Sequence, residues 1–269
     1  MRVTRLFLFG TNFKMNQTAP ESAAFFGTLA AAVTPSSEVI LFVIPPFTSL
    51  PAVVARREAT RSEICIGAQN MHWAADGAYT GEISAQMLTA IGVDFVLLGH
   101  AERRGLFHET DDALAKKVPA AIDAGLRVLL CVGETADEKR TGAGPETVAR
   151  QLKIALHAIE PASLSRIQIA YEPVWSIGKD GTPATPDDIA PVATHLRHTL
   201  TDRFGDGGAD VPILYGGSVD PKNAGTFVQV PEIDGLFVGR AAWSVDGYRN
   251  VLAAALNARG LAMDSTTDN

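Results

Sequence analysis

Residues 94–134 read DFVLLGHAERRGLFHETDDALAKKVPAAIDAGLRVLLCVGE. This stretch holds two short apolar runs, DFVLLGH (94–100) and RVLLCVGE (127–134), and between them a segment with helical spacing, ETDDALAKKVPAAIDAG (109–125). A continuous apolar run is typical of a strand that is buried on both faces of a parallel sheet. The stretch therefore predicts a strand–helix–strand unit of such a sheet.

The same alternation continues in both directions along the chain. A second helical segment, PETVARQLKIALHAIE (145–160), starts with a proline and a glutamate, which are helix-start signals. Eight strand–helix repeats without a linker predict a single-domain α/β fold, the (β/α)8 or TIM barrel. An open doubly wound sheet is the competitor, but it usually carries GxGxxG after its first strand. We place the barrel at 1–258 and a polar C-terminal tail at 259–269. The six further strand-like runs begin at Arg5, Glu38, Glu63, Ile167, Val211 and Ile233.

The composition limits the kinds of partner. Of the 269 residues, 46% are hydrophobic and 20% charged, and the net charge is −7. We expect no nucleic-acid partner, because a phosphate backbone demands clustered Lys and Arg. We also expect no signal peptide and no membrane span, because no apolar run approaches roughly 18 residues. Cys65 and Cys131 lie inside apolar runs, so free thiols and a cytoplasmic, reducing location are expected.

Polar residues and glycines gather at the ends of the predicted strands, while the strand interiors are nearly all apolar. The carboxyl ends of the strands carry the active site in such a barrel. We therefore expect the chemistry at this edge. The residues there are Asn12, Lys14, Gln69, Asn70, His100, Glu102, Cys131, Glu134, Glu172, Gly216, Gly217, Ser218 and Gly239.

Three of these side chains indicate proton transfer next to a carbonyl. Glu172 could be a partly desolvated base, His100 the electrophile that polarises the carbonyl oxygen, and Lys14 the cation facing the developing enediolate. Each alone has an ordinary structural explanation, such as a helix cap, a core histidine or a solvated lysine. Their joint position on the first, fourth and sixth strands favours catalysis. The chemistry needs no cofactor and no metal, and no set of residues has metal-ligand spacing.

Two turns predict a phosphate site. YGGSVDPKN (215–223) and FVGRAAW (237–243) each place backbone N–H groups between a strand and a helix, where anions bind. The loops after the last two strands of a barrel commonly form such a site. The connection EPVWSIGKDGTPATP (172–186) fits either a lid that excludes water or a rigid surface loop.

Several motifs resemble those of triosephosphate isomerases, in that family's order: TNFKMN, GAQNMHW…GAYTGEIS, LLGHAERR, CVGE, AYEPVWSIG and YGGSV. The resemblance implies that Glu172 shuttles protons and that neutral His100 polarises the oxygens. It also implies a homodimer, in which the loop 77–84 brings Thr80 to the partner's site. The remaining implied roles are substrate binding by Asn12 and Lys14, support of the site by Glu102, and backbone contacts to phosphate at Gly178, Ser218, Gly239 and Arg240.

Three positions depart from the family's usual motifs. Ala101 replaces a serine beside the histidine, and the lid is one residue longer, with Asp180 where a glycine is usual. Arg240 replaces the second glycine of the usual VGGASL. We expect Arg240 to offer its backbone N–H to the phosphate and to direct its side chain away from it.

The block DGLFVGRAAWSVDGY (234–248) is similar to a related branch, the L-erythrulose-1-phosphate isomerases of tetritol (erythritol or threitol) catabolism. This likeness implies a cofactor-independent isomerase that converts L-erythrulose 1-phosphate into D-erythrulose 4-phosphate through an enediolate. The alternative is the glycolytic and gluconeogenic conversion of dihydroxyacetone phosphate into D-glyceraldehyde 3-phosphate. A Schiff-base aldolase that uses Lys14, and a barrel that binds without catalysis, are the other hypotheses.

Overall fold

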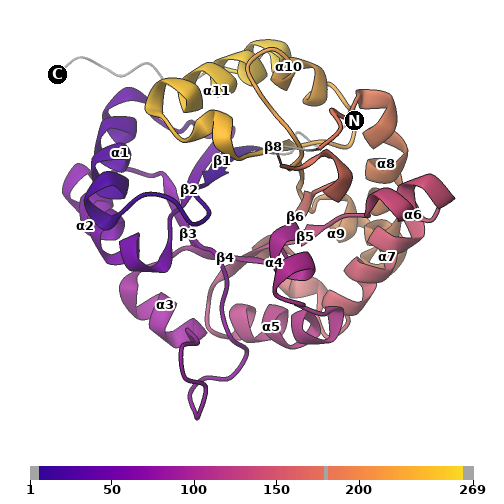
Figure 1. Ribbon diagram of the computed structural model, residues 1–269, viewed down its shortest axis with the longest axis horizontal. Helices are drawn as coiled ribbons and strands as arrows, with labels where there is room; N and C mark the ends of the chain where they lie inside the picture. Colours follow the sequence, from indigo (N-terminus) through magenta and orange to yellow (C-terminus); the bar gives the residue numbers. More distant parts are fainter. Residues whose placement is uncertain (1–5, 179–180, 263–269) are drawn as a thin grey trace.

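Eight parallel strands close into a barrel in sequence order, with helices around it (Figure 1). The computed structural model describes residues 6–178 and 181–262. Every strand lies within one of the apolar runs that predicted it, so the (β/α)8 prediction is confirmed. The strands are β1 (Phe7–Asn12), β2 (Val39–Ile44), β3 (Cys65–Ala68), β4 (Phe95–Leu98), β5 (Arg127–Val132), β6 (Ile167–Tyr171), β7 (Ile213–Tyr215) and β8 (Gly235–Val238).

Helices and short 3-10 turns connect the strands and cover the outside of the barrel. The α-helices are α1 (Ala19–Ala32), α2 (Leu50–Thr60), α3 (Ala85–Ile91), α4 (Ala101–Leu106), α5 (Asp111–Asp123), α6 (Ala136–Thr141), α7 (Gly144–Ala155), α8 (Pro186–Phe204), α9 (Asp206–Ala209), α10 (Ala224–Phe227) and α11 (Val245–Arg259). The 3-10 turns are η1 (Phe47–Ser49), η2 (Pro161–Arg166), η3 (Val174–Ser176) and η4 (Arg240–Ala242). None of the helices in the described ranges is long and apolar enough to cross a membrane.

The two predicted helices are present with shorter bounds. The segment 109–125 forms α5, whose start is capped by Thr110, because its hydroxyl accepts the Ala113 N–H at 3.1 Å. The segment 145–160 forms α7, which has a proline in its first turn, as predicted. Helix α11 extends through Arg259, the first residue of the predicted tail, and residues 263–269 of that tail lie outside the described residues.

Both faces of the sheet are buried, which explains why the strands read as continuous apolar runs. On β1, Leu8 belongs to the cluster that fills the barrel, while Phe7 and Phe9 belong to the larger cluster that includes the helices. Phe42 and Phe237 also lie in the inner cluster. This filled interior closes the barrel below the carboxyl ends of the strands, so a ligand can enter only from above them.

Candidate active site

A cavity of about 600 Å³ lies at the carboxyl ends of the strands. Its wall comes from the segments that follow β1, β4, β6, β7 and β8, which are distant in sequence. The structure therefore brings together every residue predicted for catalysis or phosphate binding. They are Asn12, Lys14, His100, Glu102, Glu172, Gly178, Ser218, Gly239 and Arg240.

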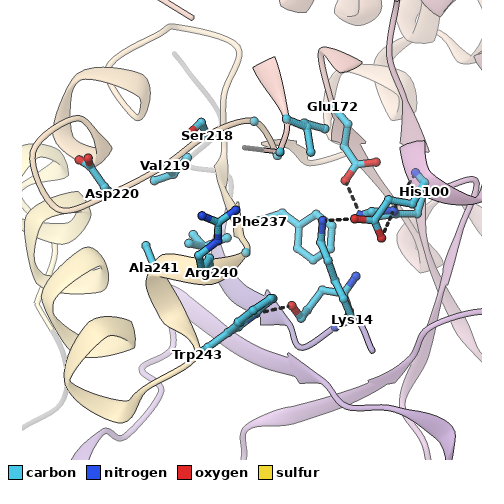
Figure 2. A pocket seen from close by; sticks show the side chains of 18 residues that line it. Lys14, His100, Glu172, Ser218, Val219, Asp220, Phe237, Arg240, Ala241 and Trp243 are labelled. Carbon is cyan, nitrogen blue, oxygen red and sulfur yellow. Dashed lines mark hydrogen bonds and ion pairs between the residues drawn. The ribbon is translucent and has the colours of Figure 1, made fainter. Parts of the chain in front are cut away.

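Glu172 directly follows β6 and is almost fully buried, with 2% of its surface exposed. One carboxylate oxygen, Oε2, accepts the backbone N–H of Ala101 at 2.9 Å. The other, Oε1, lies 3.2 Å from Nε2 of His100 (Figure 2). The neighbouring Cys131 is fully buried, and this burial, followed by the Glu172 charge, raises the pKa of the Cys131 thiol well above its ordinary value. The carboxylate is thus held against a neutral thiol and an imidazole, with little water around it.

His100 is the N-cap residue of α4. The hydrogen bond that its ring makes there indicates which ring nitrogen is protonated. Nδ1 accepts the backbone N–H of Glu102 at 3.2 Å, so Nδ1 carries no proton. In a neutral ring with this contact the proton is therefore on Nε2, which faces Glu172 and the cavity. A neutral imidazole with this tautomer can donate a hydrogen bond to a substrate oxygen, as an electrophile must.

Lys14 has a left-handed backbone, with φ of 53°. Asn12 fixes this turn, because its side-chain oxygen accepts the Lys14 N–H at 2.8 Å, and Gln69 donates its amide to the Lys14 carbonyl at 2.7 Å. The ammonium Nζ lies 2.5 Å from Oε1 of Glu102. A non-glycine residue in this region of φ and ψ costs about 1–3 kcal/mol, so the surrounding contacts hold the lysine against strain.

Four residues that we placed at the strand ends do not line the cavity, and the fully buried Cys131 is one of them. Gln69 instead supports the Lys14 backbone from outside. Asn70 accepts a hydrogen bond from buried Lys117 at 2.9 Å. Glu134, 2% exposed, lies behind the cavity and accepts bonds from other side chains. Distance along the chain from a strand end cannot separate a side chain in the cavity from one packed behind it.

The opposite wall of the cavity is made mainly of backbone. It consists of the turn that contains Ser218 and the turn that joins Gly239 to η4. In residues 6–178 and 181–262, the N–H groups of Ser218, Gly239 and Arg240 donate to no protein acceptor. Free N–H groups at a helical N-terminus are an anion-binding arrangement, which is consistent with the predicted phosphate position.

Two aromatic residues of the cavity had no predicted role. Trp243 lines the wall, and its indole N–H donates to the Asn12 carbonyl at 2.8 Å, while Gln17 donates to the Trp243 carbonyl at 3.3 Å. Phe237 forms part of the floor, with its ring edge-on to that of His100 at 6.3 Å. The only signal in the sequence was a tryptophan in the turn after the last strand, where the family's usual motif has a leucine.

The start of the predicted lid is anchored to the barrel. The indole N–H of Trp175 donates to Glu134 at 2.6 Å, and the Tyr171 hydroxyl donates to the same carboxylate oxygen at 3.0 Å. Burial raises the pKa of Glu134, while these hydrogen bonds act in the opposite direction. On the outer side, Lys139 lies 3.3 Å above the Trp175 ring and 2.8 Å from Asp188. Residues 179 and 180, including the predicted Asp180 departure, lie outside the described residues.

Within the described ranges, no cluster of His, Cys, Asp or Glu side chains could hold a metal ion. The polar groups that surround the cavity are instead a carboxylate, an imidazole, an ammonium and backbone N–H groups. This set can bind an anion and move a proton between adjacent carbons.

Comparisons with known proteins agree with this geometry. The family model described as triosephosphate isomerase matches residues 7–255. The L-erythrulose-1-phosphate isomerase of Rhizobium etli is 46% identical over 91% of this chain and 90% of its own length. The triosephosphate isomerase of Aquifex aeolicus is 41% identical over 91% of this chain and 98% of its own.

A solved structure is also similar. The crystal structure of triosephosphate isomerase from Bartonella henselae superposes with a TM-score of 0.83 at 34% identity, covering 92% of this chain and 98% of that one. The match extends over the whole barrel, including every strand that contributes to the cavity. This chain belongs to the triosephosphate isomerase family.

Proposed function

We propose that this protein is an isomerase that interconverts L-erythrulose 1-phosphate and D-erythrulose 4-phosphate in the catabolism of a tetritol. The observation that carries the chemistry is the 3.2 Å approach of the buried Glu172 carboxylate to Nε2 of His100 in one cavity. The substrate is supported by the relatives named L-erythrulose-1-phosphate isomerase, which are 41–46% identical to this chain. It is also supported by Arg240 and Trp243, which stand in the cavity wall at departures from the family's usual motif.

The proposed reaction needs only proton transfer. L-Erythrulose 1-phosphate carries its phosphate on C1, a carbonyl at C2, and a hydroxyl and a hydrogen on C3. Glu172 removes the C3 proton, while the Nε2–H of His100 and the Lys14 ammonium stabilise the negative charge that develops on the C2 oxygen. A proton then passes from the C3 hydroxyl to the C2 oxygen through the His100 imidazole, and Glu172 returns its proton to C2 as the C3 oxygen becomes the carbonyl. The product is D-erythrulose 4-phosphate, and no electron acceptor or cofactor takes part.

Glu102 and Asn12 position these groups. Glu102 contacts Lys14 through its carboxylate and His100 through its backbone N–H, so it couples the cation to the electrophile. Asn12 fixes the Lys14 turn on one side and, through its carbonyl, holds Trp243 on the other. We place the phosphate against the free N–H groups of Ser218 and Gly239, with Gly178 in the lining of the same cavity.

The decisive experiment compares kcat/KM for L-erythrulose 1-phosphate and for dihydroxyacetone phosphate on the same preparation. We expect the tetrulose phosphate to have the higher value. An equal or higher value for dihydroxyacetone phosphate would assign the protein to triosephosphate isomerisation, which the 41% identity to the Aquifex aeolicus enzyme favours as the second candidate. Glu172→Gln purified in the same way is the matched control, because its residual activity reports any host isomerase in the preparation.

We further propose a homodimer in the cytoplasm. The loop between β3 and α3, which holds Thr80, extends beyond the outline of the barrel (Figure 1). Large apolar side chains are exposed on this loop, on the segment after β1 and at the end of α4: Met15 (95%), Tyr79 (47%), Leu106 (72%) and Phe107 (64%). Exposed apolar patches of this kind mark protein contacts. The two free thiols, Cys65 and Cys131, are consistent with a reducing compartment.

Light scattering coupled to gel filtration tests the dimer. We expect the wild type to elute at twice the mass of one chain, and Met15→Asp to shift it toward the monomer. A wild type that elutes as a monomer at micromolar concentration would refute the proposal. Met87→Asp is the matched control, since Met87 is also exposed (53%) but lies on α3, away from the tip of the loop.

A further inference from the structure

Arg240 stands in the wall of the cavity, at the first position of η4. Figure 2 shows its guanidinium in the space between the turn of Ser218 and Val219 and the ammonium of Lys14. This placement differs from our expectation that the side chain would point away from the phosphate site. The reason is the turn itself, because Gly239 has φ of −92° and ψ of −123°, and the chain after it starts η4 along the cavity wall.

The guanidinium of Arg240 has no partner among the described residues, although arginine is the side chain best suited to ion pairing. Arg104, by comparison, pairs with Asp111 at 2.6 Å. The acidic residue in the same cavity wall is Asp220, and its Oδ1 accepts the N–H groups of Lys222 and Asn223 at 2.7 and 3.1 Å. Asp220 therefore caps its own turn and leaves Arg240 without a counter-charge.

The unpaired guanidinium lies beside unpaired backbone donors. The N–H groups of Ser218, Gly239 and Arg240 itself have no acceptor within the described part of the chain. A phosphate monoester carries close to two negative charges and three strong acceptor oxygens at neutral pH. Backbone N–H groups supply hydrogen bonds to such a group but only partial charge, whereas a guanidinium supplies a full charge and a planar fork of donors.

We propose that the Arg240 side chain binds the phosphate of the substrate directly, together with the backbone cradle. This proposal deepens the proposed function and rests on its phosphorylated substrate. The phosphate takes no part in the proton transfer, so the added attraction to it serves to hold C2 and C3 against His100 and Glu172. A tetrulose phosphate is longer than a triose phosphate by one hydroxymethyl group, and a stronger anchor at the phosphate limits its motion in a cavity of this size.

The test measures phosphate binding separately from turnover. Inorganic phosphate is titrated calorimetrically into the wild type, Arg240→Ala and Arg240→Met, and its inhibition constant is measured in the isomerase assay. We expect both variants to bind phosphate about tenfold more weakly or worse, as loss of a charge-assisted hydrogen bond predicts. We expect KM for the sugar phosphate to rise by a similar factor. Arg240→Met keeps the length of the side chain, so it separates loss of charge from loss of packing.

Arg249→Ala is the matched control, because Arg249 is an exposed arginine of α11 that does not line the cavity. It removes the same charge and should leave the dissociation constant of phosphate within about twofold, since an exposed charge at a distance is screened by salt. Wild-type phosphate affinity in both Arg240 variants, or equal weakening in Arg249→Ala, would overturn the proposal. These outcomes do not depend on which sugar phosphate turns over faster, so failure of the substrate assignment is recognised separately in the kinetic comparison.

Discussion

The two halves of the cavity are built in different ways. On the side of β1, β4 and β6, buried or partly buried side chains contact one another, as in the pairs Glu172–His100 and Lys14–Glu102. On the side of β7 and β8, backbone N–H groups form the wall, and the prominent side chain there, Arg240, is exposed and unpaired in the described structure. One half holds its side chains in fixed positions, and the other leaves its donors open.

This difference explains where substitutions from the family's usual motifs are tolerated. A backbone N–H donates equally well whichever side chain its residue carries, so the anion-binding turns can change residue type. A proton-transfer step needs a given side-chain atom within a fraction of an ångström, so those residues cannot change without loss of rate. Arg240 and Trp243 lie in the wall that is made mainly of backbone. Lys14, His100 and Glu172 lie in the wall of side chains that would transfer protons. Ala101 also departs from the usual motif, and the group that it contributes is again a backbone N–H, which donates to Glu172.

The largest effect is expected from Glu172→Asp. Its carboxylate is displaced by about one methylene from the substrate carbon, so kcat should fall about 10³-fold, within the range of general-base catalysis. KM should change little, because the phosphate side is untouched. Steady-state kinetics measures kcat and KM. The rate of solvent deuterium incorporation into substrate measures the proton transfer itself. A rise in KM with kcat unchanged would mean that Glu172 contributes to substrate binding and not to proton transfer.

The second effect is expected from His100→Leu, which removes the Nε2–H donor. Loss of one pre-positioned donor to a developing oxyanion costs about 10²-fold in kcat. The variant should again bind inorganic phosphate with wild-type affinity, as checked by calorimetry. Weak phosphate binding in this variant would show that the two halves are coupled rather than independent.

A smaller effect on activity, but a clear one on stability, is expected from Gly133→Ala. A Cβ atom at Gly133 would lie 1.8 Å from the carbonyl oxygen of Glu172, so β5 and β6 must move apart. Overpacking of this kind costs about 1–3 kcal/mol in the free energy of unfolding. Thermal and denaturant unfolding measure the loss, and kcat should fall with it. Gly142→Ala is the control for glycine removal, because no atom lies within 4 Å of its added Cβ, although its φ of 78° adds a strain of its own.

The smallest effect is expected outside the cavity, from Lys139→Met. The bond from Lys139, followed by bonds from Thr185, lowers the pKa of Asp188 from 3.8 to about 2. A lowered carboxyl pKa stabilises the fold above pH 3.8, and that contribution is lost as the pH falls toward 2. In the variant, the pKa of Asp188 should rise toward its ordinary value, which an NMR titration of the carboxyl carbon measures. An unchanged pKa would show that the Thr185 bonds alone set it.

Much of this arrangement could be predicted from local patterns. The eight apolar runs marked the strands because each strand is buried on both faces, so its residues must be apolar without interruption. Polar residues directly after such runs stand out, and for that reason Lys14, His100 and Glu172 were identifiable. The barrel then brings the strand ends to one edge, which makes their convergence a consequence of topology.

Other features depend on contacts between distant segments. Trp243 lies in the cavity because Asn12, 231 residues earlier, accepts its indole N–H. Glu134 and Asn70 occupy strand-end positions like those of the catalytic residues, yet they serve Trp175 and Lys117 behind the cavity. No local pattern distinguishes these cases, because the distinction depends on which side chain of another element fills the neighbouring space.

The direction of Arg240 illustrates the same limit. Local sequence determined the strands, the side chains with proton-transfer chemistry and the glycine that lets the backbone turn at the end of β8. Contacts between distant segments determine that the side chain following this glycine faces the cavity and pairs with none of the described carboxylates. Residue type and spacing determine which groups a segment can offer. The packing of the other strands and turns against that segment determines which of those groups remain open to a ligand.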